Sequence, residues 1–242
     1  MNNFGTTSRA TVLLFTWAAG SVDAIAYLAG HVFTANMTGN AVLLGVSTGE
    51  LKSTAAARAL LALVAFIAGV VLGALLVREG GLAKASADVR RAVIVEAIIL
   101  AIFAAVAMLP LPLGEGARVN LLIGVSGFGM GLQSAVVRRL NVPGIATTYI
   151  TGTITSLFSG LVHHWDVLKG GDSGEAEAGP PSEKKRSLAL QAEVFISYAL
   201  SALVTAALHA QWPSGVALLP FGAIAMVAVF LSVRKSVQVV TT

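Results

Sequence analysis

The stretch that decides the fold is Val32-Phe33-Thr34-Ala35-Asn36-Met37-Thr38-Gly39-Asn40, a polar patch that interrupts apolar sequence. A second patch, Ile145-Ala146-Thr147-Thr148-Tyr149-Ile150-Thr151-Gly152-Thr153, repeats its pattern. When the two are aligned, identical residues stand at Thr34/Thr147, Thr38/Thr151 and Gly39/Gly152. Polar, glycine-bearing breaks at corresponding places in two halves of a membrane chain are the best sequence indication of a transport site.

The composition is that of a membrane protein. Of the 242 residues, 56% are hydrophobic and only 12% are charged, whereas a soluble domain has roughly 25% charged residues. Apolar segments of helix length lie at 11–29, 55–77, 92–110, 119–137, 188–210 and 216–233. Each is close to the roughly 20 residues that a helix needs to cross a bilayer. The predicted fold class is all-α, a polytopic membrane protein in a lipid bilayer.

The same composition argues against several other classes. The chain has no cysteine, which excludes disulfides and thiolate metal sites. Its net charge of +4 comes from dispersed Lys and Arg, so we predict no nucleic-acid partner. No nucleophile–base pair, phosphate loop or metal-ligand set stands out, so we predict no enzyme, cofactor or metal. Asp23 interrupts the first apolar segment, which indicates a retained helix rather than a signal peptide.

Each patch begins a shorter helix, predicted at 36–50 and 148–165, and these helices decide the topology. If all eight helices span, Lys and Arg divide ten to six between the two sides. If the short helices enter and leave on one face, the division becomes thirteen to three, with Lys52, Arg58 and Arg118 as the minority. The positive-inside rule favours the second arrangement. We therefore predict about six transmembrane helices plus two re-entrant half-helices, in a bacterial inner membrane, with both termini cytoplasmic.

This topology predicts an inverted repeat within a single transmembrane domain, 1–242. Residues 11–110 and 118–234 would form the two repeats, and 169–187 would be a disordered cytoplasmic loop. Three crossings in each half turn the second half upside down, so the half-helix N-termini face each other near the midplane. Each N-terminus offers free backbone N–H groups and a partial positive charge. We also expect a homodimer, because six spans give little scaffold against which a mobile half could move.

Asp23 is the most informative single residue, because an acid inside a membrane is costly and usually functional. It is either a proton carrier or substrate contact, or a carboxylate that caps the nearby half-helix and holds it in place. The remaining candidate substrate-binding residues offer hydrogen bonds or close backbone approach: Asn36, Thr38, Gly39, Asn40, Gln133, Tyr149, Thr151, Gly152 and Thr153. For these the alternative is polar contact between helices, which is common in membranes. Val136, not Gln133, is the aligned equivalent of Asp23, so the halves are asymmetric.

The sequence resembles the YoaK-like family of bacterial inner-membrane proteins, a family of unknown function. The resemblance rests on Gly20-Ser21-Val22-Asp23-Ala24-Ile25-Ala26-Tyr27-Leu28, Phe33-Thr34-Ala35-Asn36-Met37-Thr38-Gly39-Asn40-Ala41-Val42-Leu43-Leu44-Gly45, Gly131-Leu132-Gln133-Ser134-Ala135 and Thr147-Thr148-Tyr149-Ile150-Thr151-Gly152-Thr153. It covers nearly the whole chain, and Ala-Asn-Met-Thr-Gly-Asn is its most specific string. It implies a polytopic membrane protein and supplies no settled substrate.

The function predicted from these features is secondary transport of a small polar or anionic solute. The solute would bind between the two half-helix N-termini, with Asp23 as the candidate for proton coupling. Two alternatives stay open: a passive channel for small solutes, and a membrane structural or interaction protein without transport.

Overall fold

The computed structural model describes residues 9–77, 82–140, 150–168 and 181–240. Within these ranges the protein is all-helical, which confirms the predicted fold class. The helices are α1 (Arg9–Gly30), α2 (Met37–Gly49), α3 (Ser53–Leu76), α4 (Leu82–Met108), α5 (Glu115–Leu140), α6 (Ile150–Leu168), α7 (Pro181–His209), the short 3-10 helix η1 (Gly215–Ala217) and α8 (Leu218–Val240).

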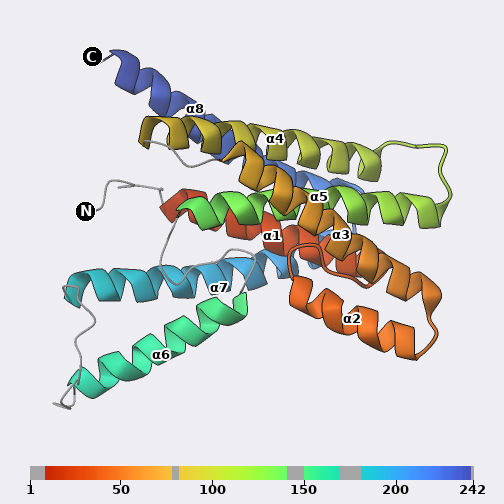
Figure 1. Ribbon diagram of the computed structural model, residues 1–242, viewed down its shortest axis with the longest axis horizontal. Coiled ribbons are helices and arrows are strands. Elements are labelled where there is room, and N and C mark those ends of the chain that lie inside the picture. The colour runs from red at the N-terminus through yellow and green to blue at the C-terminus, as the bar shows by residue number, and fades with distance from the viewer. Residues whose placement is uncertain (1–8, 78–81, 141–149, 169–180, 241–242) are drawn as a thin grey trace.

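Six of these helices, α1, α3, α4, α5, α7 and α8, are long and apolar enough to cross a membrane, as predicted. They alternate in direction along the long axis of the molecule (Figure 1). The two others are the short helices that follow the polar patches. Helix α2 has 13 residues, which gives a length of about 20 Å against a hydrocarbon core of about 30 Å. In α6 the apolar stretch among the described side chains is Thr151–Val162.

Two helices begin earlier than the sequence predicts. Helix α4 begins at Leu82 instead of 92, so most of the hydrophilic stretch 78–91 is helical. There Arg91 pairs with Asp88 one turn away, at 3.7 Å, and such pairs stabilise a polar helical turn. Helix α7 begins at Pro181, so the end of the predicted disordered loop, 181–187, is also helical, while 169–180 lie outside the described residues. Proline suits a first helical position because its φ is already helical.

The helices of the two halves pack in corresponding ways. Helix α1 packs on α7 and α8, and α5 packs on α3 and α4. The short helix α2 packs on α3, and α6 packs on α7. Contacts also join α1 to α5 and α4 to α8. If α1–α4 are exchanged with α5–α8, the first six helix pairs become one another in twos, and the α1–α5 and α4–α8 pairs stay the same.

Glycines bring the central helices into close contact. A Cβ added to Gly69 of α3 would overlap the carbonyl of Phe128, and one added to Gly131 of α5 would overlap the carbonyl of Phe66. At the corresponding α1–α7 contact, a Cβ on Gly20 would lie 2.5 Å from the carbonyl oxygen of Tyr198. Small residues at such crossings let two membrane helices approach closely. The α3–α5 and α1–α7 pairs therefore form a tightly packed frame.

We expect Gly131→Ala to destabilise the protein, because the new methyl group would clash with the backbone of α3 at Phe66, which cannot change rotamer as a side chain can. Overpacking of this kind costs about 1–3 kcal/mol. The measurement is the thermal unfolding midpoint of the purified protein in detergent. Gly124→Ala is the matched control on the same helix, since its Cβ would lie 3.9 Å from Leu61 Cδ1. Equal midpoints for the two variants would contradict the packing described here.

Candidate functional site

Helix α1 ends in a turn that sends the chain back along the helix. His31 has a φ of 56°, and its backbone N–H donates to the carbonyl of Tyr27 at 2.9 Å. A residue in the left-handed region with this hydrogen bond is a common way to end a helix. Residues 31–36, which lead from α1 to α2, are irregular.

The carboxylate of Asp23 binds this irregular segment. Its Oδ1 accepts hydrogen bonds from the backbone N–H groups of Thr34 and Ala35, both at 2.6 Å. Its Oδ2 accepts a hydrogen bond from the hydroxyl of Tyr198 on α7. Asp23 is buried and lies seven residues before Gly30, which is about 10 Å inside the end of α1. We call this set of three hydrogen bonds the Asp23 clamp; it holds the start of α2 at that depth.

Asn40 reinforces the same loop from within α2. Its side-chain oxygen accepts the backbone N–H of Phe33 at 2.9 Å, and its amide nitrogen donates to the carbonyl of Phe33 at 2.5 Å. The Phe33 ring stacks on Tyr27, with ring centroids 5.5 Å apart. A Cβ on Gly39 would lie 2.9 Å from Cδ2 of that ring, so glycine leaves room for it. Asn40 and Gly39 therefore shape the first patch.

Asn36 and Thr38 are the exposed polar residues at the start of α2. Asn36 occupies the N-cap position, where its side-chain oxygen accepts the N–H of Gly39 at 3.4 Å. Thr34 is buried, and its hydroxyl has no hydrogen-bond partner in the described part of the chain. A solute that reaches the first patch would therefore meet the side chains of Asn36 and Thr38.

In the second patch the described residues begin at Ile150, the first residue of α6, so Tyr149 lies outside them. Thr151 is exposed and Gly152 is partly exposed. Thr153 is buried, and its hydroxyl is unpaired among the described residues. Figure 1 shows α2 and α6 beginning near the middle of the long axis and running outward in opposite directions. Their N-terminal turns thus lie at similar positions along this axis.

Gln133 of α5 is fully buried and joins two of the long helices. Its side-chain amide donates to the carbonyl of Phe15 on α1 at 3.1 Å. This bond ties α5 to α1. The side chain of Gln133 therefore has a structural contact besides any contact with a solute.

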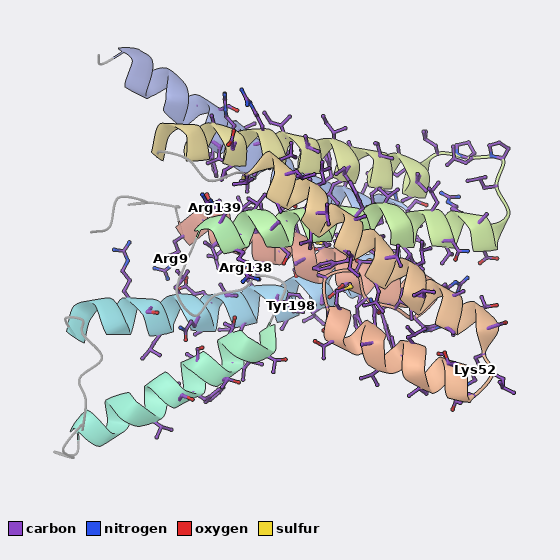
Figure 2. All side chains as sticks on the ribbon, in the orientation of Figure 1. Arg9, Lys52, Arg138, Arg139 and Tyr198 are labelled. Atoms are coloured by element: carbon purple, nitrogen blue, oxygen red, sulfur yellow. The ribbon has the colours of Figure 1, made fainter. Side chains whose placement is uncertain are left out.

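A hollow of about 410 Å³ lies where α1 ends and α3 begins. It is lined by Gly30, His31, Leu51, Lys52, Ser53, Thr54, Ala55 and Arg58. The ends of α1 and α2 therefore lie at the same end of the molecule. Figure 2 shows Lys52 toward that end and Arg9, Arg138 and Arg139 toward the other, with Tyr198 between them.

Tyr198 is the residue of this site that the sequence does not reveal. It lies 175 positions from Asp23, inside an apolar run of α7. The exposed Arg9 is also paired across the same helices, with Glu193 of α7. No group of three or more His, Asp or Glu that could hold a metal occurs among the described residues.

The model of the family DUF1275, described as "Protein of unknown function", matches residues 11–231. The chain belongs to this family. It is 38% identical over 159 residues to the UPF0700 transmembrane protein YoaK of Bacillus subtilis (strain 168), which covers 63% of this chain and 67% of that protein. No solved structure matches. These matches confirm the predicted family. The six long apolar helices of this chain are consistent with a multi-pass transmembrane protein.

We expect Asp23→Leu to destabilise the protein strongly and Asp23→Asn to do so mildly. Leucine leaves the N–H groups of Thr34 and Ala35 without an acceptor, at about 1–3 kcal/mol for each buried donor. The amide oxygen of asparagine still accepts from both. Thermal unfolding midpoints in detergent measure the difference. The clamp would be refuted by an Asp23→Leu variant that unfolds at the midpoint of the unchanged protein.

Proposed function

We propose that the protein is a secondary transporter of a small polar or anionic solute, which binds between the N-terminal turns of α2 and α6. The observation that carries this proposal is the Asp23 clamp. It fixes a helix N-terminus about 10 Å inside the end of α1, at a depth where backbone is otherwise kept in continuous helix. Interrupted helices whose N-termini point at the substrate are characteristic of secondary transporters.

The proposal includes six crossings and two re-entrant half-helices, related as an inverted repeat. The hollow shared by His31 and Lys52 supports it, because the chain leaves α1 and enters α3 at one end. The directions of the long helices support it as well. Eight crossings would make α1 and α5 parallel, whereas these two helices run antiparallel. The contacts that exchange between the two halves fit a two-fold relation.

The proposed orientation in the membrane follows from the distribution of Lys and Arg, and the proposed homodimer follows from the small number of crossings. Thirteen of the 16 Lys and Arg residues fall on the side that holds Arg9, which makes that side cytoplasmic in a bacterial inner membrane. Both termini then lie in the cytoplasm. A homodimer would supply the scaffold that six crossings lack.

The solute class follows from what the two N-terminal turns offer. Each presents backbone N–H groups and the positive end of a helix dipole, which favour an anion or a solute rich in acceptors. The exposed side chains of Asn36, Thr38 and Thr151 add neutral hydrogen-bonding groups. The Asp23 carboxylate accepts hydrogen bonds from three donors. It therefore repels an anionic solute less than a carboxylate without such donors would.

Within this site we assign Asp23 and Asn40 positioning roles. Both carboxylate oxygens of Asp23 and both polar atoms of the Asn40 side chain are engaged in the loop before α2. A proton on Asp23 would weaken the clamp that holds the loop. The exposed Asn36, Thr38 and Thr151 are therefore the residues we expect to touch the solute.

Transport is tested by flux into proteoliposomes with sulfate, phosphate, lactate and urea as probes. For the probe that is transported, we expect Thr38→Val to lower the flux about tenfold, because one hydrogen bond to a solute is worth roughly 1–1.5 kcal/mol. Thr48→Val is the matched control. Its hydroxyl donates to Leu44 within α2, at the far end of the same helix.

Three outcomes separate this proposal from its alternatives. Saturable flux that responds to Thr38→Val but not to Thr48→Val is what a transporter predicts. Flux that rises in proportion to solute concentration, without saturation, indicates a passive channel. Absence of flux for every probe, together with no thermal shift of the purified protein, favours a structural or interaction protein, since a bound solute stabilises the folded state.

A further inference from the structure

Glu96 of α4 is a buried acid that none of the contacts described so far uses. Its exposed fraction is 0%, and neither carboxyl oxygen has a hydrogen-bond partner among the described residues. Glu96 lies within the candidate membrane span of α4, about 6 Å inside the start of the apolar segment 92–110. Val93 and Leu100, one turn to either side on α4, are also fully buried.

The contact between α4 and α5 gives the level of Glu96 along these two helices. A Cβ on Gly129 of α5 would lie 3.2 Å from Ile99 Cγ2. Since α4 and α5 run antiparallel, one turn back on α4 corresponds to one turn forward on α5 (Figure 1). Glu96 is thus level with Gln133, whose amide donates to the carbonyl of Phe15.

Among the side chains that the structure describes, no charged group forms a hydrogen bond or ion pair with Glu96. The elements packed against α4 are α5, α8, α3 and η1. Their described charged residues, with those of α4 itself, lie toward helix ends: Glu115, Arg118, Arg138 and Arg139 on α5, Arg58 on α3, and Asp88, Arg90 and Arg91 on α4. An isolated carboxylate in such surroundings is very costly, so the group is neutral here. Asp23 contrasts with it, because three donors surround its carboxylate.

We propose that Glu96 is a proton-binding site of this protein, taking up one proton from water and releasing it when water reaches the side chain. Uptake converts the carboxylate to the neutral acid that fits the closed packing; release reverses this step and requires water to reach the side chain. That this proton is the one coupled to solute movement rests on the transport function proposed above. Proton binding by Glu96 does not rest on it.

Infrared spectroscopy of the reconstituted protein tests proton binding without any solute. We expect a carboxylic acid C=O band at neutral pH that shifts in D₂O and is lost reversibly as the pH rises. The band should be absent in Glu96→Gln and retained in Asp23→Asn. In Glu96→Asp it should move rather than vanish, which keeps the test decisive if the glutamine variant folds poorly. Identical spectra for the unchanged protein and Glu96→Gln, or a band that neither exchanges nor titrates, would overturn the proposal.

Coupling is tested in proteoliposomes that contain the pH dye pyranine, with sulfate, phosphate, lactate and urea as probes. In proteoliposomes with the unchanged protein, we expect transport of a probe to be accompanied by proton movement, which pyranine reports as a pH change. In Glu96→Gln that proton movement should be lost while exchange of the probe continues. Equal proton movement in both would overturn the coupling role. If no probe moves, the transport function fails, and the infrared band alone decides whether Glu96 binds a proton.

Discussion

The structure depends on the bonds between the Asp23 carboxylate and the backbone N–H groups of Thr34 and Ala35. Backbone that leaves a helix inside a membrane needs partners for its polar groups, because hydrocarbon supplies none. A carboxylate serves two such donors at once and forms stronger hydrogen bonds than a neutral group does. Tyr198 then connects the same carboxylate to α7, so the break in the first half is held by a helix of the second half.

This constraint separates residues that look alike in the sequence. Asn36 and Asn40 stand one turn apart, yet Asn40 binds both polar backbone groups of Phe33 while Asn36 caps the helix at the surface. Among the acids, Asp23 is fully engaged and Glu96 has no partner in the described chain. An engaged acid suits a fixed part of the site, and a free one suits a group whose charge changes. We therefore assign position to Asp23 and proton exchange to Glu96.

The sequence predicted the six long helices because an apolar run of about 20 residues has few other uses. It also placed both short helices, since the polar patches end one apolar run and begin another. It missed the starts of α4 and α7, because helix that extends beyond the membrane carries no apolar signal. It missed Tyr198 because a contact across 175 positions leaves no local pattern. Whether Asp23 holds the loop or carries a proton depends on where the neighbouring hydrogen-bond donors lie, which only the three-dimensional structure shows.

The central claim is that α2 begins inside the membrane and returns to the end it came from. Single cysteines at Lys52, Arg138 and Arg186, all exposed positions, test it directly, because the chain has no cysteine of its own. A membrane-impermeant thiol reagent should label Lys52→Cys from outside the cell, and Arg138→Cys and Arg186→Cys only from the cytoplasmic side. If Lys52→Cys and Arg186→Cys label from the same side, the short helices cross the membrane and the claim is contradicted.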